Sequence, residues 1–425
     1  MFETLRNAWR IPDLRKKLLY TLFMLLIYRA GSVIPTPFVD IEAVAQGFNS
    51  AGVLGMIDMF NGGALSQFTI FATGISPYIT ASIVLQLLTV AIPALERLQK
   101  DGGEDGRKKI AQYTRYAAIA LSCIQSLGMI LGLGTQILTN QSWYAYATVL
   151  IVQAAGAAFA MWLGERITER GIGNGISMLI FINIVSNLPN QFWKDMWDGA
   201  ARTIRWGPTF GLFAVTIGVL LAVVYVDLGV RRIPVQYAKR VVGRKTYGGQ
   251  STHIPLKVNN SGVMPLIFAM TLASFPGMIF QLFAASENWF GNFARGYAIH
   301  MAQGTWLYNV VLALLVLFFT YFYSQISFNP VDISKNLQQY GGMLPGVRQG
   351  KPTSDYLARI NNRLSLFSAL FFMIMAVVPT IITLLTGSSS PFGATSILIM
   401  VSVALESSKQ LESQMLMRHY KGFLN

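Results

Sequence analysis

The stretch QGTWLYNVVLALLVLFFTYFYSQISF, residues 303–328, decides the fold class, because it contains no Asp, Glu, Lys or Arg. As an α-helix it is long enough to cross about 30 Å of hydrocarbon. Nine further stretches of about 20 residues or more share this apolar character. They are 18–36, 68–93, 112–133, 143–163, 173–193, 208–229, 262–286, 364–385 and 391–411. The sequence therefore predicts an all-α integral membrane protein with ten transmembrane helices.

The overall composition agrees with this prediction. Hydrophobic residues make up 53% of the 425 residues and charged residues 12%, with a mean hydropathy of +0.46. This is too apolar for a single soluble core of that length. The one cysteine, Cys123, lies in an apolar stretch, which excludes disulfides and CxxC metal sites within the chain.

Basic residues alternate between the two sides of the predicted spans. Of the 33 Lys and Arg residues, 28 fall into six clusters, at residues 1–17, 97–115, 166–170, 231–257, 335–363 and from 409 onward. Short loops rich in Lys and Arg stay on the cytoplasmic side, so we expect both termini to be cytoplasmic. Orientation and attraction to anionic lipids thus explain the net charge of +14 without nucleic acid. Arg29, near the outer end of the first span, is expected to extend to the outer membrane surface.

Five spans precede residue 200 and five follow it. An odd number of spans per half means that two similar halves would run in opposite directions through the membrane, which is the arrangement of an inverted repeat. We therefore expect an N-terminal half, 1–200, and a C-terminal half, 201–425. The polar gaps 230–261 and 329–363 of the second half are expected to project into the cytoplasm.

Residues 52–66, GVLGMIDMFNGGALS, form an unusual short segment between the first two spans. A helix of about 14 residues would reach only about 21 Å, so this segment cannot span the membrane. Backbone groups left unpaired in lipid are costly, which favours a segment that fills a cavity within the protein. A helix lying on the outer surface remains the alternative.

Motifs of enzyme chemistry are nearly absent. His253, His300 and His419 lie far apart, and the sequence contains no HExxH motif and no phosphate loop ending in GK[ST]. The sequence GIGNG, residues 171–175, is best interpreted as a tight turn. We therefore predict that the chain is not an enzyme and uses no cofactor and no metal.

A secondary transporter is the main alternative function, because inverted repeats are typical of transporters. Transporters generally carry polar or ionisable groups near the membrane midplane, whereas the middles of these spans are apolar. Ile75 and Ile79, like Ile180 and Ile184, are one helical turn apart. Such pairs form either ordinary core packing or a hydrophobic constriction that loses its water when closed.

Five motifs resemble the bacterial SecY family over essentially the whole chain. They are TGISPYITASIVLQLL (73–88), ITERGIGNGIS (167–177), RRIPVQYAKR (231–240), STHIPLKVN (251–259) and LPGVRQG (344–350). The resemblance implies the pore-forming subunit of a protein-conducting channel, with two halves braced by SecE. Such a channel translocates unfolded secretory proteins across the cytoplasmic membrane and releases membrane-protein segments sideways into lipid.

The resemblance also implies residue roles. The family's pore ring falls on Ile75, Ile79, Ile180, Ile184, Ile267 and Ile399. Its plug falls on residues 52–66, with Val53, Leu54, Met56, Ile57, Asp58, Met59, Phe60, Asn61, Gly62 and Gly63. The lateral gate would have Thr80, Gln86 and Asn260 near its seam. Docking of SecA and the ribosome falls on the basic residues Lys239, Arg240, Arg244, Lys245, Arg348 and Lys351.

The resemblance further implies partners and a location. Expected partners are SecE, SecG, the SecA motor ATPase and the ribosome, with signal peptides and unfolded preproteins as substrates and no small-molecule substrate. Because the chain has no nucleotide motif, the energy must come from a partner. The expected location is the bacterial cytoplasmic membrane, with anionic lipids around the chain.

Overall fold

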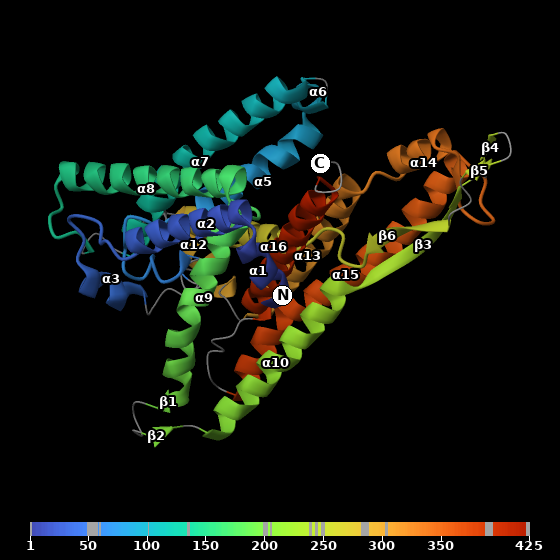
Figure 1. Cartoon of the computed structure of the whole chain (residues 1–425). Helices are drawn as coiled ribbons and strands as arrows, with labels where there is room; N and C mark the ends of the chain where they lie inside the picture. Colours follow the sequence, from blue (N-terminus) through green and yellow to red (C-terminus); the bar gives the residue numbers. More distant parts are fainter. Residues whose placement is uncertain are drawn as a thin grey trace. The chain divides into compact units, whose positions relative to one another are not determined.

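The computed structural model describes most of the chain, including all or part of each of the ten predicted spans. The described residues are 2–48, 58, 61–100, 102–133, 137–198, 203–204, 206–237, 240–242, 245–247, 251–281, 289–301, 305–386 and 394–421. One helix corresponds to each predicted span (Figure 1). These helices are α2 (Pro12–Gly31), α5 (Ser76–Ala91), α7 (Gly103–Leu133), α8 (Trp143–Arg170), α9 (Gly175–Met196), α10 (Trp206–Leu228), α11 (Met264–Gln281), α13 (Trp306–Ser327), α15 (Lys351–Thr386) and α16 (Ala394–Lys421).

Shorter elements lie between the long helices. The helices are α1 (Phe2–Arg10), α3 (Ile41–Phe48), α6 (Pro93–Lys100), α12 (Trp289–His300) and α14 (Pro330–Gln339). The strands are β1 (Trp197–Asp198), β2 (Thr203–Ile204), β3 (Val230–Tyr237), β4 (Arg240–Val242), β5 (Lys245–Tyr247), β6 (Ser251–Lys257) and β7 (Gly342–Met343). The tight turn predicted at 171–175 is confirmed, since α8 ends at Arg170 and α9 begins at Gly175.

Length and composition identify the most apolar helices as candidate membrane spans. Within the described ranges, four helices pass this test, namely Gly103–Leu131, Trp143–Arg170, Trp306–Gln339 and Lys351–Val377. The pair α5 and α6, bent by 105°, would count as a fifth span. Three shorter helices are also apolar, and α2 carries charged residues near both ends, including Lys17 and Arg29. The chain is thus a multi-pass membrane protein of helical fold.

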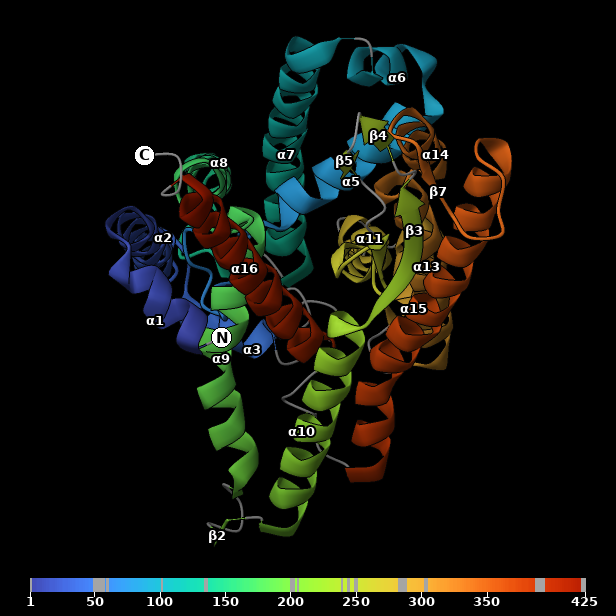
Figure 2. The same ribbon diagram turned by 45° about the vertical axis from the view of Figure 1, so that its right-hand side comes forward.

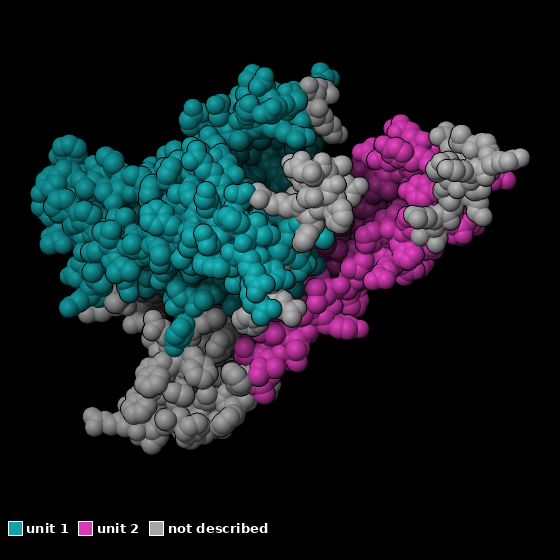
Figure 3. Space-filling model, in the orientation of Figure 1, with its two compact units in different colours: residues 1–209, 270–309, 399–425 teal, residues 210–269, 310–398 magenta. Residues whose placement is uncertain are grey.

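The chain forms two compact units, coloured separately in Figure 3. Unit 1 comprises residues 1–209, 270–309 and 399–425, and unit 2 comprises residues 210–269 and 310–398. The division differs from a simple cut at residue 200, because segments late in the sequence belong to unit 1. The two compact units are defined by packing in space, whereas an inverted repeat is defined by the similarity of two parts of the chain. The inverted repeat of the halves 1–200 and 201–425 therefore stays a prediction.

Unit 1 is built around neighbouring long helices. Helix α7 packs against both α5 and α8, and α8 also contacts α2 and α9 (Figure 1). A buried cluster fills the space between α3, α7, α8 and residues 65–72, which include the end of the predicted plug. It consists of Val44, Leu65, Phe68, Ala72, Met129, Ile130, Ile137, Leu138 and Val149. The end of the plug segment is therefore part of this unit's core.

Unit 2 contains a small module built from both of its long loops. Strand β3 pairs with β6 from Val230 to Gln236, and its end pairs with β7, a strand from the second loop. Figure 2 shows β3 and β7 beside α14 and α15. Buried residues of this module are Ile233, Val235, Leu256, Phe328, Leu337, Leu344, Leu357 and Ile360. The loops 230–261 and 329–363 therefore share one core, and we call this module the platform.

Candidate functional site

The last part of the predicted plug is a compact turn. Oδ1 of Asp58 accepts hydrogen bonds from the backbone N–H groups of Leu65 and Ser66, each at 2.9 Å. The backbone N–H of Gly63 donates to the carbonyl of Asp58 at 3.1 Å. One carboxylate thus closes the turn, and we call residue 58 together with residues 61–66 the plug turn. The predicted plug residues Val53, Leu54, Met56, Ile57, Met59 and Phe60 lie outside the described residues.

Gly62 lets the plug turn approach α9 closely. Its φ is +70°, in the left-handed region that favours glycine. A Cβ atom on Gly62 would lie 2.8 Å from Oδ1 of Asn183 and 3.1 Å from the Cα atom of the same residue. A Cβ atom on the neighbouring Gly63 would lie 3.3 Å from Oδ1 of Asn187. The plug turn is therefore seated directly on the part of α9 that carries Ile184.

Arg29 reaches the plug turn from α2. Its Nη1 atom lies 3.4 Å from the carbonyl oxygen of Gly62 and 3.5 Å from Oδ1 of Asn183, both at the long limit for hydrogen bonds. Nδ2 of Asn183 in turn donates to the Tyr28 hydroxyl at 2.9 Å. The expectation that Arg29 extends to the outer membrane surface is therefore wrong. The half-buried guanidinium faces the plug turn instead.

Asn61 connects the plug turn to the beginning of α5. Its side chain is fully buried, and its Nδ2 atom donates to the backbone carbonyl of Ala72 at 2.7 Å. A Cβ atom at Gly74 would lie 2.5 Å from Oδ1 of Asn61, so the two residues are in close contact. Gly74 is followed by Ile75, the residue at the N-cap position of α5. The plug turn thus touches the immediate neighbours of two predicted pore-ring residues.

The predicted pore-ring residues are mostly buried. Their exposed fractions are 2% for Ile75, Ile180 and Ile184, 4% for Ile267 and 0% for Ile399, while Ile79 is partly buried. The pairs on α5 and α9, together with Ile399 of α16, belong to unit 1, and Ile267 belongs to unit 2. Their convergence on one central axis stays a prediction.

The predicted gate residues lie on α5 and just before α11. Thr80 is buried, and its hydroxyl donates to the carbonyl of Ser76 within the helix at 3.1 Å. Gln86 is partly buried two turns further along α5. Among the described residues, the buried Nδ2 atom of Asn260 has no hydrogen-bond partner. The role of these three residues at a gate seam stays a prediction.

Two of the predicted docking residues, Arg348 and Lys351, lie on the platform. Arg348 is exposed, and its backbone carbonyl accepts a hydrogen bond from the Thr353 hydroxyl at 2.7 Å. Lys351 is also exposed and begins α15. Arg240 and Lys245 lie on the paired strands β4 and β5, while Lys239 and Arg244 lie outside the described residues. Strands β4 and β5 form a sheet of their own, apart from the sheet of β3, β6 and β7.

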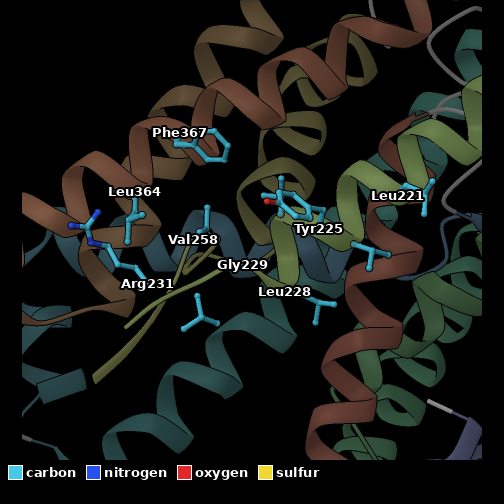
Figure 4. Close-up of a pocket in the computed structure, with 11 residues that line it drawn as sticks. Leu221, Tyr225, Leu228, Gly229, Arg231, Val258, Leu364 and Phe367 are labelled. Carbon is cyan, nitrogen blue, oxygen red and sulfur yellow. The ribbon is translucent and has the colours of Figure 1, made fainter. Parts of the chain in front are cut away.

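An apolar groove runs along the end of α10 beside α15 in unit 2. It encloses about 770 Å³ (Figure 4). The lining residues are predominantly apolar, with one arginine, and include Leu221, Tyr225, Leu228, Arg231, Leu364 and Phe367. The Tyr225 side chain is 83% exposed. The groove is therefore an open, mainly apolar surface.

Polar residues inside two spans were missed by the sequence analysis. Gln153 of α8 and Asn183 of α9 are both completely buried and hydrogen-bonded, so these helices are not apolar throughout. A polar residue within a membrane span is by itself a sign of a functional contact. The signal was present in the sequence but was outweighed by the apolar residues around it.

The chain is similar to known channel proteins over its full length. The SecY family profile matches residues 69–408. The protein translocase subunit SecY of Streptomyces galbus is 45% identical, with 100% of each chain covered. Two solved structures share the fold at lower identity.

The first structure is described as showing that the plug domain of the SecY protein stabilises the closed translocation channel and maintains a membrane seal. It is 19% identical, with a TM-score of 0.66, and covers 94% of this chain and 92% of its own. The second, Sec61 in the canine ribosome-channel complex, is 16% identical, with a TM-score of 0.61 and the same coverage. By its family profile and its full-length similarity to a curated relative, the chain belongs to the SecY family.

Proposed function

We propose that this protein-conducting channel carries unfolded secretory proteins across the bacterial cytoplasmic membrane and releases membrane-protein segments sideways into lipid. The observation that carries the proposal is the seat of the plug turn, where Gly62 contacts Asn183 beside Ile184 and Asn61 contacts the residues before Ile75. A resting channel needs a stopper at its narrowest point, because an open aqueous pore would leak ions.

The pore ring forms the seal around the translocating chain. A substrate polypeptide presents every type of side chain, so a wall with few specific hydrogen bonds suits all of them. Branched aliphatic side chains such as those of Ile75 and Ile180 exclude water when the pore is closed. The seal therefore depends on a close fit of the pore ring and on the exclusion of water from it, with the plug as a second barrier.

Sideways release sorts substrates by hydrophobicity. Moving about ten Leu-like residues from the channel into lipid is favourable by roughly 3–6 kcal/mol, whereas each central Lys or Arg costs about 2.5–3.5 kcal/mol. A lateral gate near Thr80, Gln86 and Asn260 would expose the segment to lipid. The free energy of transfer then determines whether the segment enters the lipid or stays in the channel. Binding of a signal peptide shifts the population toward the open gate.

Energy comes from cytoplasmic partners that dock on the platform. Its exposed basic residues, including Arg348 and Lys351, suit an acidic surface of SecA or the phosphates of ribosomal RNA. The related Sec61 protein has been observed in a ribosome-channel complex, which supports the ribosome as a partner. Both termini and the platform are then cytoplasmic, anionic lipids surround the basic loops, and the channel itself is not an enzyme.

SecE and SecG complete the channel within the membrane. We assign the groove between α10 and α15 to SecE, because its open apolar lining would be shielded by a helix and Arg231 is available to a polar group at its end. Phe367→Ala should weaken co-purification of SecE, since a groove-lining aromatic is lost. Leu366→Ala is the matched control, because Leu366 is similarly exposed but does not line the groove. Equal loss of SecE from both variants would contradict the assignment.

The proposed function is tested by deleting residues 53–66 in purified channels reconstituted into planar bilayers. Without its stopper, the resting channel should show a clear increase in ion conductance. A second variant with Ile180 and Ile184 replaced by serine should leak as well and should export substrates with defective signal peptides. Unchanged resting conductance in both variants would overturn the proposal.

A further inference from the structure

We propose that Gln153 of α8 is a positioning residue for the pore. Its side chain fastens residues 69–73, the segment that connects the plug turn to Ile75 at the start of α5. This inference rests on the proposed function, because the position of Ile75 matters for sealing only if Ile75 belongs to the pore ring.

Gln153 makes three hydrogen bonds inside the protein. Its Nε2 atom donates to the backbone carbonyl of Thr69 at 2.8 Å and to Oγ1 of Thr36 at 2.9 Å. Its Oε1 atom accepts a hydrogen bond from the backbone N–H of Thr73 at 3.4 Å. The exposed fractions of these four residues are 0–2%. One side chain therefore holds both ends of the segment 69–73.

Ser122 of α7 supports this arrangement from the other side. Its hydroxyl lies 3.3 Å from the hydroxyl of Thr73 and 3.4 Å from the backbone carbonyl of Gln153. Ser122 is also completely buried. The connection between α7, α8 and the segment is therefore a continuous polar network, which is sensitive to the loss of any member in a low-dielectric interior.

Gly156 brings α8 close enough for Gln153 to reach the segment. A Cβ atom at Gly156, one turn further along the helix, would lie 1.9 Å from the carbonyl oxygen of Ile70. No other residue fits there without moving the backbone. Phe71, next to Ile70, is stacked on Tyr28 and Phe159 with ring centroids 5.1 and 6.1 Å away. Hydrogen bonds and packing thus fix the same short segment.

Gln153 adds its hydrogen bonds to those that the backbone of the segment makes with Ala64 and Ile34. The backbone groups of the segment are buried within a membrane protein, where unpaired N–H and C=O groups are disfavoured. Removing the amide of Gln153 takes this partner from the N–H of Thr73, while the carbonyl of Thr69 still accepts the N–H of Ala72 at 2.9 Å. The end of the segment at Thr73 then samples other positions, and Ile75 moves with it.

The test compares Gln153→Met with Gln125→Met in reconstituted channels. Methionine conserves the volume of glutamine but removes its hydrogen bonds. Gln125 of α7 is 3% exposed, and among the described residues neither of its side-chain amide atoms has a hydrogen-bond partner. We expect Gln153→Met to increase resting ion leakage about tenfold, the factor that corresponds to losing about 1.4 kcal/mol of buried hydrogen bonding. Gln125→Met should leave the leakage unchanged.

Two further measurements separate a positioning role from a general loss of stability. Thr36→Val removes one of the three hydrogen bonds with little change in shape, and it should give an intermediate leakage even if Gln153→Met fails to fold. Channels with Gln153→Met or Thr36→Val should already leak at temperatures below the onset of their thermal unfolding. Leakage that appears only with unfolding, or equally in Gln125→Met, would overturn the role of Gln153.

The plug deletion is measured in the same membranes. If deletion of residues 53–66 raises conductance but Gln153→Met and Thr36→Val do not, the inference about Gln153 is wrong and the proposed function stands. If neither the deletion nor the variant with Ile180 and Ile184 replaced by serine raises conductance, the proposed function itself is wrong.

Discussion

Asp58 and Leu65 are joined by a hydrogen bond of 2.9 Å from the backbone N–H of Leu65 to the carboxylate of Asp58. The same carboxylate oxygen also accepts the N–H of Ser66. Leu65 is completely buried in the core of unit 1, whereas Asp58 is partly buried. The bond therefore connects the start of the plug turn to its buried end, which is part of the core of unit 1.

Asp58→Ala should loosen the plug turn. Hydrogen bonds to a charged acceptor contribute about 1.5–3 kcal/mol, so the backbone N–H groups of Leu65 and Ser66 should exchange with solvent faster in the variant. Hydrogen exchange followed by mass spectrometry measures this change, and resting conductance should rise with it. Asp40→Ala is the control, because Oδ1 of Asp40 accepts a hydrogen bond of 2.9 Å from the backbone N–H of Glu42 at the exposed start of α3. Slow exchange at Leu65 in the Asp58 variant would contradict the prediction.

Gly62→Ala should displace the plug turn from α9. The left-handed φ of Gly62 costs alanine roughly 1–2 kcal/mol, and the added Cβ atom also collides with Asn183. We expect increased leakage and a shorter lifetime of the closed state in single-channel recordings. Gly218→Ala, in the middle of α10 with nothing within 4 Å of the new atom, should be neutral or slightly stabilising. Closed-state lifetimes that are equal in both variants would argue against a tight seat.

Hydropathy and charge were sufficient to locate the ten long helices. Both signals are local, since a window of about 20 residues decides whether a helix can cross the membrane. The paired strands β3 and β6 were missed. The alternation that buries Ile233 and Val235 and exposes Arg232 and Pro234 is visible in the sequence, but it extends over few residues.

The contacts of the candidate site could not be predicted from such local signals. Gln153 and Thr36 are 117 positions apart, and Asn183 and Tyr28 are 155 apart. A single sequence records the polar residues but not their partners. The same limit applies to Arg29, whose place near a span end predicted a surface position, whereas its guanidinium faces Gly62.

Leu357→Ala should destabilise the platform. Leu357 is completely buried among Val235, Leu337 and their neighbours, and truncation of a buried leucine costs about 2–5 kcal/mol. Limited proteolysis of the purified channel should then cut the loops 230–261 and 329–363 faster. Tyr356→Ala, at a 38% exposed position next to it in sequence, should leave the cleavage rate unchanged. Equal protease resistance in the Leu357 variant would mean that the two loops do not depend on a common core.

Arg348→Glu should weaken docking of SecA while the platform stays folded. The side chain is exposed, and the surrounding turn is held by backbone contacts, namely the bond from the Thr353 hydroxyl and that from the Val347 N–H to the carbonyl of Leu344 at 3.1 Å. The loss of one exposed ion pair corresponds to about 1 kcal/mol, and added repulsion increases the effect at low salt. Binding of SecA to channels in nanodiscs measures the change. The difference from the unmodified channel should shrink as salt rises, because ions screen exposed charges.

Lys335→Glu is the control for Arg348→Glu, because Lys335 is an exposed basic residue of α14 on the same platform and carries the same charge change. If net charge alone drives docking, both variants should weaken SecA binding equally. If Arg348 makes a specific contact, its reversal should have the larger effect and should also reduce ATP-driven transport of a preprotein. Binding by the Arg348 variant that equals that of the unmodified channel at low salt would remove Arg348 from the docking surface.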